Sequence, residues 1–351
     1  LLNFMAERIE GRPLGVLLVG AGIVGGGAIR ELQATDGLLL RHAIIDDPNK
    51  LREFRAPYST DWGEALRDPK VDLVVHLVPG INPALGHAYD SIERELPFIT
   101  ANKALIATFA KELFDAARNR IEVRYDAAVA GEIPAFDAIG NEQLTRVLGI
   151  INGTTNYILT KMGEGMDFES ALAEAQSLGF AEKDHILDTG GFDTRDKLII
   201  LAAEAFNARI LQSQIQPTGI TDITPEHIDL AKQNGQVIKL IASAERDGGI
   251  LKVGVSPTLM SSDDPIAVSK VLNAIKLIGP GVEKTLTGRG AGRDATTIAV
   301  MRDILRAADN RRRGIVNPTL TLDAPFEIVD FSRIPTRDGR LNIEDFPVLA
   351  A

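Results

Sequence analysis

Short apolar runs and longer amphipathic stretches alternate along the chain up to about residue 130. Each apolar run ends near glycine, aspartate or proline, a pattern typical of buried strands that lead into turns. The apolar runs lie at 15–20, 38–45, 71–78 and 97–100, and helical patterns lie at 61–67, 82–95 and 105–119. This alternation predicts an α/β domain with a doubly wound parallel sheet.

Beyond residue 130 the regular alternation ends, and longer helical patterns mix with strands. The mixture predicts a second domain of the α+β class. Helical patterns lie at 168–178, 193–206 and 225–233, and strand patterns at 235–244 and 253–255. We therefore expect a first domain at 1–135, to which part of 285–315 returns, a second at 136–310, and a C-terminal tail at 311–351 without an assigned role.

Composition narrows the classes of function. The 351-residue chain has a formal net charge of -10 and no basic cluster, which argues against nucleic acid or an anionic membrane as a partner. The absence of cysteine excludes disulfides, thiolate nucleophiles and cysteine metal ligands. No apolar stretch has the length of a membrane span, and the five histidines lack zinc-like spacing. We expect a cytoplasmic protein that acts on a small molecule.

A glycine motif follows the first predicted strand and opens a helix. Its spacing, Gly20-x-Gly22-x-x-Gly25, is that of the dinucleotide fingerprint in Rossmann folds. Gly20 would make the tight turn, Gly22 would let the backbone approach a pyrophosphate, and Gly25 would allow close packing of helix and strand. Ile23 and Val24 begin the helix whose N-terminus would receive the phosphates. The alternative is a glycine-rich turn that binds nothing.

Asp46 follows Gly25 by 21 positions, at the end of the second predicted strand. A carboxylate there accepts a hydrogen bond from the ribose 2′-OH and repels a 2′-phosphate, which favours NAD over NADP. Lys50 and Arg52 lie close enough in sequence to offset that repulsion. The prediction is therefore a cofactor that is NAD or NADP, with a weak preference for NAD.

A polar segment from Glu182 to Lys197 precedes the apolar run that starts at Leu198. Asp193 is predicted to be the N-cap of a helix, with Lys197 on the same face four residues later. The positive end of the helix dipole disfavours an ammonium group there unless Asp193 or Glu182 compensates. Such a lysine can transfer protons. The alternative is an ordinary capped helix with an i,i+4 ion pair.

Three segments resemble homoserine dehydrogenases almost letter for letter: Thr100-Ala-Asn-Lys-Ala-Leu, Ile151-Asn-Gly-Thr-Thr-Asn-Tyr-Ile-Leu and the Glu182 to Lys197 segment. The resemblance implies reversible NAD(P)-linked reduction of L-aspartate 4-semialdehyde to L-homoserine, in threonine and methionine biosynthesis. It also implies a homodimer. We expect a short form of the enzyme, without an aspartokinase segment or an ACT regulatory domain.

The resemblance also implies roles for individual side chains around the reacting carbonyl. Lys197 matches the proton donor, and Lys103 matches a second lysine near nicotinamide and substrate, so either could supply the proton. Glu182 matches the residue that binds the substrate ammonium, Asp193 one that orients substrate and lysine, and Asp188 an accessory acid.

Further residues are implied around these. Asn102 would position Lys103 at the cofactor. Asn152 and Thr154 would line the substrate pocket, although a helix N-cap is an equal alternative for this turn. Gly292 would bring backbone to the nicotinamide side of the cofactor, with a plain glycine turn as the alternative.

The segment from Asp126 to Pro134 resembles the family's loop for a monovalent cation, Na⁺ or K⁺. The resemblance implies that backbone carbonyls hold the ion. The ligands would be those of Asp126, Val129, Gly131 and Ile133. The sequence departs from the family pattern at two positions, because Asp126 replaces the usual Glu and Glu132 replaces a usual Gly.

Two other functions stay open at this stage. One is a nicotinamide-dependent oxidoreductase that acts on another amino-acid semialdehyde or on a 2-hydroxy acid. The other is a binding protein that senses NAD(P) without catalysis. The presence of both Lys103 and Lys197 argues against the second, because sensing requires no proton relay.

Overall fold

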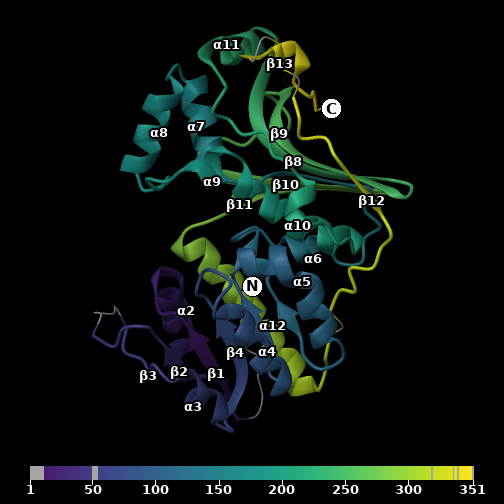
Figure 1. Ribbon diagram of the computed structural model, residues 1–351. Coiled ribbons are helices and arrows are strands. Elements are labelled where there is room, and N and C mark those ends of the chain that lie inside the picture. Colours follow the sequence, from purple (N-terminus) through teal and green to yellow (C-terminus); the bar gives the residue numbers. More distant parts are fainter. Residues whose placement is uncertain (1–11, 50–53, 318, 335, 338–339, 350–351) are drawn as a thin grey trace. The chain divides into compact units, whose positions relative to one another are not determined.

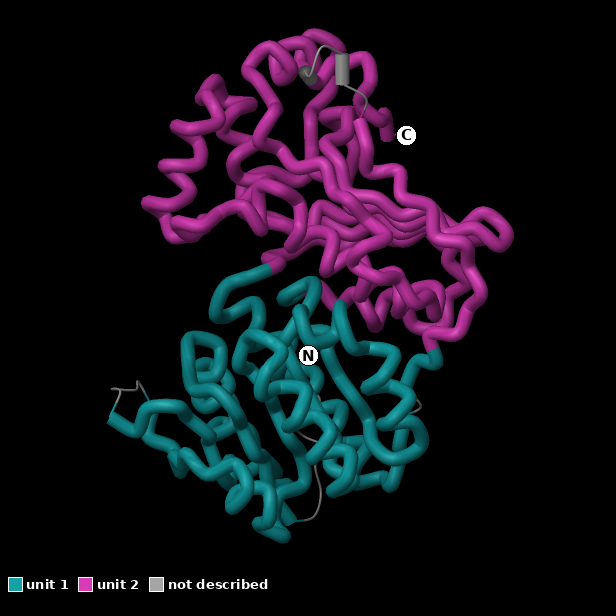
Figure 2. The backbone as a smooth tube through the Cα atoms, in the orientation of Figure 1, with its two compact units in different colours: residues 1–132, 291–321 teal, residues 133–290, 322–351 magenta. Residues whose placement is uncertain are grey.

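The computed structural model describes residues 12–49, 54–317, 319–334, 336–337 and 340–349. The chain forms two compact units, each assembled from two separate segments (Figure 2). Unit 1 contains Leu1–Glu132 and Ala291–Thr321, and unit 2 contains Ile133–Gly290 and Leu322–Ala351.

Unit 1 is built on a six-stranded parallel sheet in the order β3-β2-β1-β4-β5-β6 (Figure 1). The direction of progression reverses between β1 and β4. Since crossovers between parallel strands are right-handed, α2 covers one face of the sheet, and α4 and α5 cover the other. This confirms the prediction of a doubly wound α/β sheet. The strands are β1 (Leu14–Val19), β2 (Leu38–Ile44), β3 (Tyr58–Ser59), β4 (Val71–His76), β5 (Phe98–Thr100) and β6 (Val123–Arg124).

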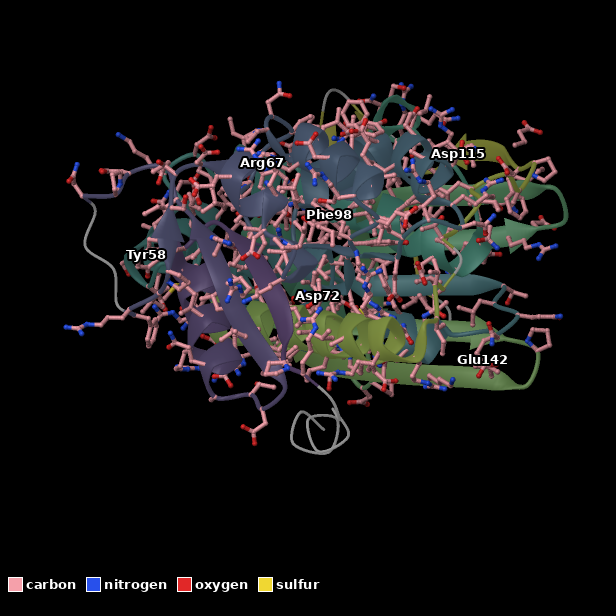
Figure 3. The ribbon with its side chains drawn as sticks, turned by 90° about the horizontal axis from the view of Figure 1, so that it is seen from below. Tyr58, Arg67, Asp72, Phe98, Asp115 and Glu142 are labelled. Carbon is pink, nitrogen blue, oxygen red and sulfur yellow. The ribbon has the colours of Figure 1, made fainter. Side chains whose placement is uncertain are left out.

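The helices of unit 1 come from both of its segments. The late helix α12 packs beside α2 so closely that a Cβ on Gly27 would lie 2.3 Å from Thr297 Oγ1. The sheet is also tied together by polar contacts: Asp72 on β4 accepts a hydrogen bond from the Gly15 amide at 2.8 Å (Figure 3). The helices are α2 (Ile23–Gln33), α3 (Trp62–Arg67), α4 (Ala84–Glu93), α5 (Lys103–Ala117), η1 (Asp126–Ala128) and α12 (Arg293–Arg313).

Unit 2 is built on a second six-stranded sheet, in the order β11-β10-β7-β8-β9-β12. All pairs are antiparallel except β12 with β9, where a strand from the C-terminal tail joins the edge in parallel. The main strands are β7 (Arg146–Ile150), β8 (Gln236–Asp247), β9 (Ile250–Ser261), β10 (Leu272–Gly279), β11 (Val282–Arg289) and β12 (Glu327–Asp330), and a separate hairpin pairs β13 (Thr336–Arg337) with β14 (Arg340–Leu341).

Helices α7 and α10 both pack against β8, α7 also contacts β10 and α10 contacts β7, while α8 packs on α7. Side chains of the second sheet form a small apolar core, to which Leu148, Met260 and Leu349 contribute. The helices of unit 2 are α6 (Ala135–Ile139), α7 (Gly153–Gly163), α8 (Phe168–Ser177), α9 (Ile186–Thr189), α10 (Phe192–Phe206), η2 (Gln212–Gln214), α11 (Pro225–Gln233) and η3 (Ile343–Asp345).

Candidate active site

The glycine motif of unit 1 forms the turn between β1 and α2. Gly20 has φ of +94°, a conformation that favours glycine, and a Cβ on Gly25 would lie 1.9 Å from the Gly20 carbonyl oxygen. Gly22 differs, because a Cβ there would meet nothing within 4 Å. It is the N-cap of α2 and offers no side-chain cap, so the first amides of the helix, at Ile23 and Val24, lack that partner. Open space beside an uncapped helix N-terminus fits a pyrophosphate.

Asp46 lies on the same edge of the sheet as this turn. Val19, the last residue of β1, is in register with Ile44, the last of β2, so Gly20 and Asp46 both follow the carboxyl ends of neighbouring strands. The Asp46 side chain is exposed, and one of its oxygens accepts a hydrogen bond from the Asp47 amide at 2.9 Å. An exposed carboxylate at this position matches the acidic residue that contacts the ribose in Rossmann folds. Lys50 and Arg52 lie outside the described residues.

Asn102 and Lys103 follow β5 at that same carboxyl edge. The Asn102 Oδ1 caps α5 by accepting from the Leu105 amide at 3.0 Å. Its Nδ2 donates to the carbonyls of Val78 at 3.1 Å and Gly80 at 2.5 Å, which ties the loop after β4 to the loop after β5. Lys103 is the first residue of α5 and is partly exposed. Asn102 therefore fixes the backbone from which Lys103 extends.

Gly292 is the N-cap of α12 and has φ of +97°, with open space where its Cβ would lie. The neighbouring Arg293, which the sequence did not single out, donates from Nε to the Ile23 carbonyl at 3.2 Å. It thus places a cationic side chain beside the first turn of α2. Its position after the Gly290-Ala-Gly292 turn is the only sequence signal that pointed toward it.

In unit 2, four predicted residues form one hydrogen-bonded cluster. Asn152 Nδ2 donates to Asp188 at 2.7 Å and to Asp193 at 3.0 Å. Asp193 also lies 2.9 Å from Lys197 Nζ, which donates in turn to the Ile151 carbonyl at 2.9 Å. Lys197 is 9% exposed, so its ammonium is held by a carboxylate and a carbonyl with little help from water.

Asn152 has the N-cap role that the sequence left as one of two alternatives, and its other end contacts two aspartates. Its Oδ1 accepts from the Thr155 amide at 2.8 Å and caps α7, while its Nδ2 bridges the two aspartates. The amide group has an acceptor and two donors, so one side chain can perform both tasks. The cap therefore positions the donor at the end of β7.

The predicted N-cap at Asp193 is wrong. Helix α10 begins at Phe192, and its N-cap is Gly191, whose φ of +81° turns the chain directly from α9 into α10. Asp193 consequently lies inside the first turn, where the helix dipole stabilises a carboxylate. Lys197 lies one turn further along, and the dipole penalty on its ammonium is smaller there than the sequence predicted.

Thr154 and Glu182 lie outside this cluster in the described part of the chain. The Thr154 hydroxyl donates to the Phe180 carbonyl at 2.6 Å and so anchors the segment that leads to Glu182. The Glu182 side chain is exposed, and its backbone carbonyl accepts from Gln176 at 3.1 Å. The structure therefore separates a buried cluster from an accessible carboxylate.

The predicted cation loop lies against α12 in unit 1. The buried guanidinium of Arg302 pairs with the Asp126 carboxylate at 2.6 Å and donates to the carbonyls of Glu132 at 3.3 Å and Gly131 at 3.5 Å. The Asp126 carbonyl accepts from the Val129 amide, and the Ile133 carbonyl from the Ala135 amide. Three of the four expected carbonyl ligands, those of Asp126, Gly131 and Ile133, therefore already accept hydrogen bonds, and a buried guanidinium lies beside the loop. This setting disfavours a sodium or potassium ion.

Comparison with known proteins covers both units. The family model of homoserine dehydrogenase matches residues 136–305, and the model of the homoserine dehydrogenase NAD-binding domain matches residues 20–125. The chain is 34% identical over 324 residues to the homoserine dehydrogenase of Bacillus subtilis, a match that covers 87% of this chain and 75% of the relative. The chain belongs to the homoserine dehydrogenase family.

Other homoserine dehydrogenases give the same result. The Corynebacterium glutamicum enzyme is 34% identical over 95% of this chain and 81% of its own length. The crystal structure of a homoserine dehydrogenase from Thiobacillus denitrificans matches with a TM-score of 0.84 and 31% identity, covering 91% of this chain and 80% of that one. An archaeal homoserine dehydrogenase in complex with NADPH, at 23% identity, 88% and 99% coverage and a TM-score of 0.71, shares the fold.

The family prediction made from the sequence is therefore confirmed. The predicted class of enzyme is confirmed as well, because homoserine dehydrogenases are NAD(P)-dependent oxidoreductases that act on a CH–OH group. In the described part of the chain, every helix is too short or too polar to cross a bilayer.

Proposed function

We propose that the chain catalyses the reversible NAD(P)-dependent reduction of L-aspartate 4-semialdehyde to L-homoserine, a step toward threonine and methionine. Its membership of the homoserine dehydrogenase family supports this reaction. The observation that carries the mechanism is the setting of Lys197. An ammonium group has three N–H donors, and Asp193 and the Ile151 carbonyl accept two of them. The third donor remains for the oxygen of the substrate.

In this proposal the nicotinamide, when bound, supplies the hydride that reaches the aldehyde carbon. Lys197 donates a proton to the aldehyde oxygen as negative charge develops on it, and recovers the proton in the reverse direction. Asp193 keeps Lys197 charged and oriented. Lys103 is the alternative donor, since it extends from the cofactor edge of unit 1.

The carboxylates are proposed to hold the amino-acid part of the substrate. Glu182, accessible on the surface of unit 2, would bind the ammonium group, and Asp188 and Thr154 would complete the pocket with Asn152. Asn152 reduces the repulsion between Asp188 and Asp193 by donating to both. None of these steps involves the loop from 126 to 133.

For the cofactor we propose NAD in preference to NADP, because the exposed Asp46 would repel a 2′-phosphate. The turn that Gly20 and Gly25 shape would place the pyrophosphate beside Gly22, and Asn102 and Gly292 would lie on the nicotinamide side. The archaeal relative binds NADPH, but that observation concerns the archaeal protein and does not set the cofactor preference of this chain. We also propose a cytoplasmic homodimer, a state that size-exclusion chromatography with light scattering would test.

The first experiment measures oxidation of NADH and of NADPH in separate assays with L-aspartate 4-semialdehyde, followed by reduction of NAD⁺ and NADP⁺ with L-homoserine at high pH. Turnover in both directions is expected, faster with the non-phosphorylated pair. If the cofactors bind but are not consumed, the assignment to homoserine fails, and assays with other semialdehydes and with 2-hydroxy acids follow.

A further inference from the structure

A buried arginine of α12 packs against the loop where the family resemblance implies a monovalent cation. Arg302, on α12, is 3% exposed, and Asp126, at the start of the loop, is 2% exposed. Two guanidinium nitrogens of Arg302 reach the same carboxylate oxygen of Asp126, Nε at 2.8 Å and Nη2 at 2.6 Å. The two side chains therefore balance each other's charge in a place that water does not reach.

The guanidinium also faces the backbone of the loop. Nη1 donates to the Glu132 carbonyl at 3.3 Å, and Nη2 lies 3.5 Å from the Gly131 carbonyl. Asp126 and Glu132 are the two positions at which the loop departs from the family pattern. Both departures thus occur at residues that contact Arg302.

We propose that Arg302 serves as a built-in monovalent cation, so that the loop of residues 126–132 binds neither sodium nor potassium. The guanidinium carries the same single positive charge and directs it at the same kind of oxygen ligands. Because an arginine side chain is not deprotonated in proteins, this charge is permanent. A metal ion added to the loop would face a like charge a few ångströms away, without water to screen it.

The neighbouring charges do not replace Arg302 in this role. Arg124 pairs with Glu122 at 2.5 Å and lies 3.7 Å from Asp303. Arg124 forms these ion pairs with side chains, whereas Arg302 also donates hydrogen bonds to the backbone of the loop. Arg124 therefore provides a control: it is a second, partly buried arginine of unit 1, and its loss should not make the loop depend on a metal ion.

The test compares thermal unfolding in sodium, potassium and tetramethylammonium chloride at equal ionic strength. For the wild-type chain the three midpoints are expected to agree within about 1 °C. A rise of about 4 °C or more in sodium or potassium alone would overturn the proposal. The measurement does not use the substrate, so its result is independent of the proposed reaction.

Substitution of Arg302 then tests whether the loop needs a cation for its stability. Arg302→Met removes the charge and should lower the midpoint strongly in tetramethylammonium, with recovery of about 4 °C or more when sodium replaces it. Arg124→Met should also lower the midpoint but show no such recovery. An Arg302→Met midpoint that is the same in all three salts would contradict the proposal. If that variant does not fold, Arg302→Lys decides: it keeps the charge and must remain insensitive to the choice of salt.

Discussion

Lys197 and Asp193 lie one turn apart on α10 with 2.9 Å between the ammonium nitrogen and a carboxylate oxygen. The lysine is nearly buried, so this pair and the Ile151 carbonyl provide most of its solvation. Burial makes the geometry stiff, because any rotation of the ammonium breaks a charge-assisted hydrogen bond. In the proposed mechanism, a lysine held this way keeps one N–H direction for the substrate.

The first prediction concerns Lys197. Lys197→Met should reduce kcat with aspartate semialdehyde by about a hundredfold or more while cofactor binding persists, since a positioned general acid contributes that much. Lys103→Met tested in parallel identifies the donor. Lys161→Met is the control, because Lys161 on α7 pairs with Glu164 and Glu174 and has no assigned role in the reaction. Unchanged kcat in the Lys197 variant would transfer the role to Lys103.

A second prediction separates the two tasks of Asn152. Asn152→Asp keeps an acceptor for the Thr155 amide and so preserves the cap of α7. It loses both donations to the aspartates and adds a third carboxylate beside them. We expect kcat/KM to fall by at least about tenfold. Asn152→Ser, which keeps the cap without new charge, should lose less. Equal activity of Asn152→Asp and the wild type would exclude the bridging role.

The glycine turn gives a third prediction from two substitutions three residues apart. Gly22→Ala puts its methyl group into open space, so the fold should be unaffected while KM for the cofactor rises about tenfold. Gly25→Ala drives its methyl against the Gly20 carbonyl and should cost about 2 kcal/mol in unfolding free energy. Urea denaturation and steady-state kinetics measure the two effects. If Gly22→Ala instead lowered stability and Gly25→Ala instead raised the KM for the cofactor, the cofactor would not lie beside Gly22.

Asp46 supplies a fourth prediction, on the choice of cofactor. Asp46→Ser removes the charge that would repel a 2′-phosphate and keeps a hydroxyl for hydrogen bonding. The ratio of kcat/KM for NADPH to that for NADH should rise by about tenfold. Asp47→Ser, at the next exposed position, is the control. A ratio that does not move in the Asp46 variant would place the ribose elsewhere.

His76 gives a prediction for the pH dependence of stability. Its ring is fully buried at the end of β4, and this burial, with a smaller effect of the nearby His87, lowers its pKa from 6.5 to about 4. Between these values the unfolded chain binds the proton more readily than the folded one. The folding stability contributed by neutral His76 is therefore complete above pH 6.5 and decreases as the pH falls toward 4, by about 3 kcal/mol.

Urea denaturation at pH 7 and at pH 4.5 measures this loss of folding stability. His76→Leu fills the same buried position without a titrating group, so its loss of stability at low pH should be smaller than that of the wild type by nearly the full amount. Identical losses in the two proteins would show that His76 becomes protonated without unfolding.

The sequence predicted features that depend on local pattern. The parallel strands of unit 1 follow from apolar runs that end in turn residues, and the turn from Gly20 to Gly25 follows from steric demands within six residues. The start of α10 was missed because Gly191 takes a left-handed conformation that composition alone does not reveal. The contact of Arg302 with Asp126 joins residues 176 positions apart, and no pattern in either segment indicates it.

Helix α12 has a consequence for how the protein is made. The helix packs on α2 through Gly27 and Thr297, yet all of Ile133–Gly290 is translated between those two residues. Until α12 is made, the apolar residues that it covers therefore stay uncovered, including Leu18 and Leu73 of the sheet and Ala28 of α2, which share a core with Ile304. Unit 1 can therefore complete its fold only after the first segment of unit 2 has been synthesised. During this interval we expect the nascent chain to be most prone to aggregation and to need a chaperone.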